Sequence, residues 1–138
     1  LNGANTFGGG LTLNAGSLVL GNGGALGTGA LNVNGAVTLG STAAMTVGNG
    51  ITLGAGGSLN VLGSNALTLG GVIGGTGSLV KNGASTLTLN GSNSFSGGLN
   101  ANAGSLLLGN SGALGTGALG IGGNVSLDGS AALNLGND

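Results

Sequence analysis

The sequence predicts an all-β fold: a right-handed parallel β-helix with three strands per coil and about six coils. The first observation behind this prediction is a long internal repeat. Residues 1–50 align with residues 89–138 without a gap, and most aligned positions are identical, so one repeat unit is residues 1–88. The other two observations are recurring apolar–polar–apolar triplets and an abundance of glycine, 37 residues, without any proline. Long repeats are typical of chains in which similar units stack and support their neighbours. We therefore expect residues 1–138 to form one β-helical segment, an excerpt of a longer repeat array.

The triplets predict short strands. Alternation with a period of two places the flanking aliphatic side chains inside and the central Thr or Ser in water. Gly, Asn and Ser bound each triplet, and these residues suit sharp turns. A helix is disfavoured, because each interior Gly costs about 1 kcal/mol relative to Ala. The predicted strands contain Leu11–Leu13, Val37–Leu39, Met45–Val47, Ile51–Leu53, Leu67–Leu69, Leu87–Leu89 and Val125–Leu127.

The predicted strands fall into three interleaved series, and most steps within a series have nearly the same length. One step in each series is longer than the others, and it contains residues 93–98: Val72 to Leu99, Leu79 to Leu106, and Leu87 to Ala113. We interpret the repeat unit as four whole coils, with a bulging insertion in the longer step. An antiparallel sandwich is the alternative, although it would not place three series in step. The series begin near Leu11, Leu31, Ile51, Val72, Leu99 and Leu119; near Leu18, Val37, Leu59, Leu79, Leu106 and Val125; and near Ala25, Met45, Leu67, Leu87, Ala113 and Leu133.

This geometry has two further consequences. Parallel crossovers are right-handed in about 98% of cases, so we expect a right-handed coil. Stacked Asn side chains can form hydrogen-bonded ladders at the corners. The side chains that we expect to point inward are Leu13, Leu39, Leu53, Leu69, Leu89 and Leu108.

Composition and charge exclude several functions. A net charge of −1 is incompatible with the basic patch that nucleic-acid binding requires. No uninterrupted apolar run approaches the length that a membrane-spanning helix needs, so we do not expect this segment to span a membrane. The absence of His and Cys removes the ligands of soft metals. Glycine-rich stretches are present, but neither the periodic Asp of calcium-binding repeats nor a phosphate-binding motif accompanies them.

We predict no catalytic, cofactor-binding or metal-binding residues. General acid–base catalysis needs clustered titratable groups, and the only charged residues are Lys81, Asp128 and Asp138. The two Asp residues are about half a coil apart in sequence and are expected on different faces. We expect Asp128 to be a turn residue that replaces Gly40 of the first copy, and Lys81 to be a solvated charge on an outer face.

Two outward features remain. The Thr residues of the triplets are single and spread over the faces, so we interpret them as solvent-facing strand residues rather than a binding array. Phe7 and Phe95 are the only aromatic residues, one per repeat. An inward Phe that fills a wider coil is the favoured interpretation.

Residues 75–83, 86–98 and 102–106 together resemble the autotransporter-associated β-strand repeat. Residues 1–20 enter the same motif midway, with Asn5-Thr6-Phe7 in place of Asn93-Ser94-Phe95. This sequence departs from the family pattern at Phe95, where Tyr is frequent, and at Ala101, which occupies an aliphatic strand position. The resemblance implies the passenger region of a bacterial autotransporter, secreted and displayed at the cell surface.

The sequence thus predicts a structural stalk or fibre segment of a secreted bacterial surface protein that supports adhesion or self-association without catalysis. The expected partners are neighbouring β-helical coils or further copies, with a host or neighbouring-cell surface as another possibility. One alternative is the subunit of an extracellular filament that stacks end to end. A less favoured alternative is a glycan- or ice-binding face.

Overall fold

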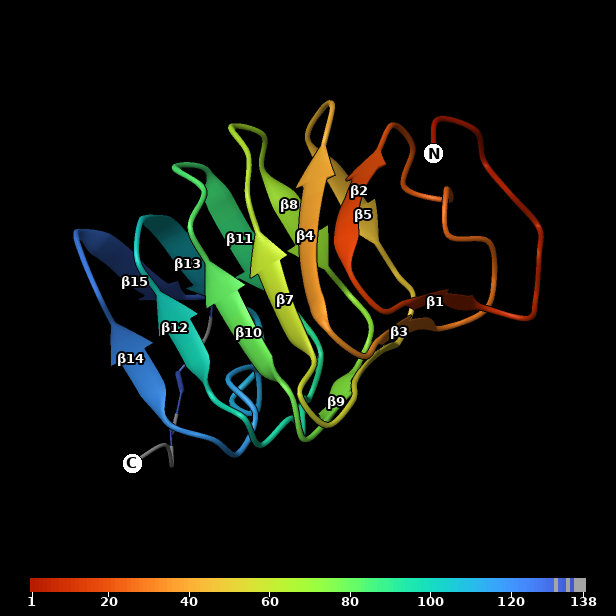
Figure 1. The fold of residues 1–138 in the computed structure, drawn as a ribbon. Coiled ribbons are helices and arrows are strands. Elements are labelled where there is room, and N and C mark those ends of the chain that lie inside the picture. The colour runs from red at the N-terminus through yellow and green to blue at the C-terminus, as the bar shows by residue number, and fades with distance from the viewer. Residues whose placement is uncertain (131, 134, 136–138) are drawn as a thin grey trace.

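The computed structural model describes residues 1–130, 132, 133 and 135. These residues form fifteen short strands and no helix. The chain winds into a β-solenoid of about six coils and advances along one axis, from the red N-terminal coil to the blue C-terminal coil (Figure 1). The predicted parallel β-helix with three strands per coil is confirmed, whereas its right-handed sense stays a prediction.

Three parallel sheets, which we name A, B and C, form the walls of the solenoid. Every strand pairs with the strand one coil away, so hydrogen bonds run along the axis. All seven predicted triplets lie in strands. Sheet A contains β1 (Leu11–Leu13), β3 (Leu31–Val33), β6 (Ile51–Leu53) and β9 (Ile73–Gly75); sheet B contains β2 (Gly16–Leu20), β4 (Ala36–Ser41), β7 (Ser58–Val61), β10 (Ser78–Lys81), β12 (Leu99–Ala101) and β14 (Leu119–Ile121); sheet C contains β5 (Met45–Val47), β8 (Leu67–Leu69), β11 (Thr86–Leu89), β13 (Gly104–Leu108) and β15 (Val125–Gly129).

The core consists of aliphatic columns that run along the axis. In sheet C one column passes through Val47, Leu69, Leu89 and Leu108, and all four side chains are buried. Full burial of such a side chain contributes about 1.5–3 kcal/mol. Five of the six leucines that we expected to point inward are buried. The sixth, Leu13, is half-buried in the first coil.

The assignment of strands to series is wrong in the C-terminal part of the chain. Leu99 pairs with Leu79 in sheet B, although its equivalent in the first copy, Leu11, lies in sheet A. Leu106 likewise lies in sheet C, one wall beyond Leu18 in sheet B. The second copy of the repeat is therefore displaced around the axis by one wall.

The longer step explains this displacement, because it holds a complete wall rather than a bulge. Beyond β9, the backbone N–H of Ser94 donates to the carbonyl of Ile73 at 2.8 Å, and that of Ser96 donates to Gly75 at 3.0 Å. The step is thus one coil plus one additional wall. The repeat unit spans four coils and one wall, not four whole coils.

One strand start was also misplaced by a residue. Val72 is 53% exposed, whereas Ile73 is buried and pairs with Ile51. Because side chains alternate between the faces of a strand, a shift of one residue exchanges inside and outside. The apolar pair Val72-Ile73 could not resolve this choice from sequence.

Hydrogen-bonded Asn side chains stack at the corner after sheet B, as predicted, and this ladder begins at Asn60 within β7. The amide of Asn82 donates to Asn60 Oδ1 at 2.9 Å, and the amide of Asn102 donates to Asn82 Oδ1 at 2.7 Å. Gly122 follows in the next coil, where a Cβ would collide with Asn102 Oδ1. Some of the glycine in this chain therefore makes room for the Asn side chain of the preceding coil.

Candidate functional site

The repeat's Asn-Ser-Phe segment joins three successive coils. Asn93 is buried; its Oδ1 accepts the backbone N–H of Ile73 at 2.7 Å, and its Nδ2 donates to the carbonyl of Ala113 at 2.6 Å. In the first copy, Asn5 makes the equivalent bond to Ala25 at 2.7 Å. A buried amide with both ends paired connects the coils without an unsatisfied polar group. The Asn-Ser-Phe segment therefore forms a corner of the solenoid that hydrogen-bonds to the coils on both sides.

The phenylalanines of this corner pack against glycine in the next coil. Phe95 is buried, and its carbonyl accepts the N–H of Thr116 at 3.0 Å. Gly115 has φ +70°, and a Cβ there would lie 3.0 Å from the Phe95 ring. Phe7 makes the same backbone bond in the first coil but remains 39% exposed. Phe95 thus points inward as predicted, whereas the same prediction is wrong for Phe7, which is exposed in the first coil.

Lys81 is not a solvated surface charge, and that prediction is wrong. Its side chain is only 1% exposed, because it occupies the second inward position of β10, two residues after Leu79. Nζ donates to the carbonyl of Gly83 at 2.5 Å and to that of Ala103 at 3.1 Å. The alternation Leu79-Val80-Lys81 is the sequence signal for this burial.

Desolvation by burial lowers the pKa of the Lys81 ammonium from its ordinary value of 10.5. We expect the free energy of unfolding to rise as the pH increases from the folded-state pKa towards 10.5. In that window the unfolded chain binds more protons than the folded one, so deprotonation favours the fold. Urea titrations across the alkaline range measure this slope. Lys81→Met should reduce it, and an equal slope in this variant would contradict the assignment.

The acidic residues do not form a site. Asp128 is exposed on β15, where its Oδ1 accepts the backbone N–H of Gly129 at 2.8 Å. It is a strand residue rather than the predicted turn residue, and Gly40 lies in strand β4 as well. Asp138 lies outside the described residues. Among the residues with described positions, no group of three or more His, Cys, Asp or Glu side chains comes together.

Three threonines form one ordered row, although the triplet threonines as a set are spread over all three sheets, as predicted. Thr46, Thr68 and Thr88 stand in register on the outer face of sheet C. The next two positions in this row are Leu107 and Asp128. The row therefore ends after three coils, and the other triplet threonines lie on sheets A and B. The third predicted series already places these three threonines on one wall, and the strand register shows that they are direct neighbours.

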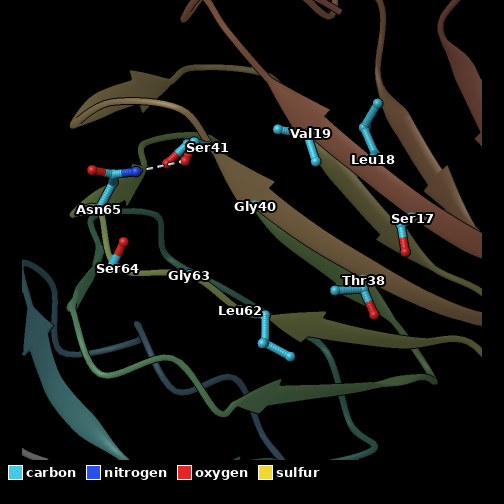
Figure 2. Close-up of a pocket in the computed structure, with 10 residues that line it drawn as sticks. All are labelled: Ser17, Leu18, Val19, Thr38, Gly40, Ser41, Leu62, Gly63, Ser64 and Asn65. Carbon is cyan, nitrogen blue, oxygen red and sulfur yellow. Dashed lines mark hydrogen bonds between the residues drawn. The ribbon is translucent and has the colours of Figure 1, made fainter.

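A shallow groove of about 340 Å³ lies on the outside of sheet B, near the corner towards sheet C (Figure 2). The exposed side chains of Val19 and Leu62 stand on its two sides, and Gly40 lies between them. Asn65 donates to the carbonyl of Ser41 at 2.7 Å at one end. The groove has no charged lining residue, so it provides no group for acid–base chemistry.

Comparison with known families identifies the corner. The sequence pattern of the passenger-associated-transport-repeat matches residues 1–20 and residues 79–108. Two stretches of the chain are thus similar to this repeat. Residues 79–108 include Lys81 and the Asn93–Phe95 corner, and residues 1–20 include Asn5 and Phe7. The resemblance to the autotransporter passenger repeat is confirmed.

No curated protein and no solved structure matches the chain. The repeat copies and the β-solenoid fold together support a structural segment of the autotransporter passenger type. Within the described part of the chain, no helix has the length and apolarity needed to span a membrane.

Proposed function

We propose that the chain is a structural stalk or fibre segment of a secreted bacterial surface protein, that it performs no catalysis, and that it supports adhesion or self-association. The observation that carries this proposal is that the residues matching the passenger repeat include the Asn93–Phe95 corner, which connects three successive coils. Asn93 hydrogen-bonds the coil before it and the coil after it. The matched range 79–108 therefore includes a buried side chain that connects neighbouring coils of the solenoid.

The electrostatics of the solenoid agree with a structural role. The only lysine donates its hydrogen bonds to backbone carbonyl groups, and Asp128 lies exposed on sheet C. Catalytic sites instead concentrate titratable groups in clefts, where neighbouring charges perturb one another. The match to a passenger repeat supports the proposed secretion across the outer membrane and the proposed location at the bacterial surface.

Self-association is proposed from the end coils of the described segment. Large apolar side chains are exposed at both ends: Leu1 and Phe7 in the first coil, and Ile121 and Leu127 in the last strands. Among the described residues, sheet B ends at β14 and sheet C at β15, and the edge strand of a parallel sheet can pair with a further strand. In a stalk the strand that pairs with such an edge belongs to the same chain. In a filament it belongs to a second copy of the chain.

Light scattering of the isolated chain separates the stalk from the filament. Across a concentration series up to the high micromolar range, a filament subunit should grow in mass, with an axial repeat of about 4.8 Å in fibre diffraction. Because the described residues contain few charges, this growth should barely respond to salt. A soluble monomer throughout the series would contradict the filament and leave the stalk.

A further inference from the structure

The coils of the solenoid are so similar that their sequence specifies only weakly which coil stacks on which neighbour. Register partners along sheet B lie one coil apart and repeat the same residue type, as in Leu79, Leu99 and Leu119. Apolar columns discriminate weakly between Leu, Val and Ile neighbours, since burial energy depends mainly on area. A coil could therefore stack on the wrong neighbour, with one coil looped out, at little cost to the columns.

One inward column breaks this uniformity. In sheet B it passes through Val61, Lys81 and Ala101, which are buried, and ends at the register position of Ile121, which is exposed on β14. Lys81 is among the largest fully buried side chains of the described chain, and its neighbour in the next coil, Ala101, is a small one that is fully buried. The large side chain of Lys81 thus stacks directly on the small side chain of Ala101 in the next coil.

The ammonium group extends from this column to the corner between sheets B and C. There it donates to Gly83 of its own coil and to Ala103 of the next coil. A Cβ on Gly104 would lie 2.7 Å from Nζ, so glycine at this position leaves space for the ammonium group. The charge is therefore held between two consecutive corners, and one of its two acceptors belongs to the neighbouring coil.

We propose that Lys81 and Ala101 together fix the stacking register of the coils. If the coil that contains Ala101 were skipped, Ile121 would take the place of Ala101 above Lys81. Val125 would take the place of Gly104, where a Cβ would lie 2.7 Å from the Lys81 ammonium nitrogen. Larger apolar side chains against a buried ammonium group would overpack the column and displace the charge from its acceptors, which is disfavoured. Single buried polar residues specify register in the same way in coiled coils. Lys81 is thus a positioning residue, which selects one arrangement among similar ones.

Cysteine pairs on sheet C measure the register, because the chain contains no Cys of its own. Thr88 and Leu107 are register partners in adjacent coils, and Leu107 and Asp128 are the next partners. Adjacent strands lie about 4.8 Å apart, within the Cα separation that a disulfide accepts, whereas two coils span about twice that distance. The pair Thr88→Cys/Leu107→Cys therefore reports the native register. The pair Thr88→Cys/Asp128→Cys reports a chain that has skipped one coil.

The two double-cysteine variants are each refolded from urea under oxidising conditions. The fraction of chains with a disulfide is then measured in the soluble, β-rich product. With Lys81 present we expect the native disulfide almost alone. With Lys81→Met we expect the skipped-coil disulfide to increase at least about fivefold, because the ammonium no longer penalises the wrong neighbour. Leu79→Met, an inward change on the same strand, is the matched control and should leave the ratio unchanged.

Ala101→Leu provides a second route to the same result, since the larger side chain fills the space beside Lys81. It should also raise the skipped-coil disulfide relative to the native one. The proposal is overturned if Lys81→Met and Ala101→Leu both give the disulfide ratio of the Leu79→Met control.

Discussion

Replacing Leu69 by Asp is expected to unfold the central coils. Leu69 is buried in β8 and stands in register between Val47 in the coil before and Leu89 in the coil after. A carboxylate at this position would meet only aliphatic neighbours in its column. The penalty for burying an unpaired ion is several kcal/mol even after relaxation. Total stabilities of native domains are about 5–15 kcal/mol, so this one change removes a large share.

Urea denaturation followed by far-UV circular dichroism checks this expectation. Thr68→Asp is the matched control, because Thr68 is the neighbouring residue on the same strand and points outward. It adds the same charge without burying it and should shift the midpoint little. Equal midpoints for the two variants would mean that the column through Leu69 is not buried.

The sequence was sufficient to predict the architecture of the walls. Triplets such as Leu67-Thr68-Leu69 specify which side chains lie inside, because alternation leaves little choice once one face is apolar. The asparagine ladder was equally predictable, since Asn residues recur near the ends of successive strands. These features depend on local pattern, and the structure reproduces them at Asn60, Asn82 and Asn102.

The placement of each strand on a wall was not predictable in the same way. The longer step from Val72 to Leu99 is consistent with one coil and an insertion, or with one coil and an additional wall. Only the backbone bonds of Ser94 and Ser96 to the preceding coil decide for the wall. Residues 93–98 also lack the apolar–polar–apolar triplet that marks the other walls, so the sequence interpretation treated them as a bulge.

The contacts of Lys81 and Ala101 could be predicted only in part from the sequence. The burial of Lys81 was missed because its charge was given more weight than its position in the alternation Leu79-Val80-Lys81. Ala101 was noted as an unusual strand residue, but its relation to Lys81 depends on the register between two coils. Such complementarity between residues of neighbouring coils becomes visible only when the coils are stacked.

The displacement of the repeat by one wall predicts an all-or-none difference between two engineered disulfides. In the structure Val80 and Asn100 are outward register partners in sheet B. If the repeat unit were instead four whole coils, Asn100 would follow the sheet A strand β9, near Gly74. The pairs Val80→Cys/Asn100→Cys and Gly74→Cys/Asn100→Cys therefore test the two arrangements directly. Both substitutions in each pair lie on outward strand positions, so the core remains intact.

The deciding measurement is the disulfide content of these two variants after oxidation of the folded chain, read by mass spectrometry of proteolytic fragments. The solenoid described above predicts a near-complete Val80→Cys/Asn100→Cys disulfide and no bond in the Gly74→Cys/Asn100→Cys variant. A disulfide between positions 74 and 100, without one between 80 and 100, would contradict both the coil assignment and the displacement of the repeat.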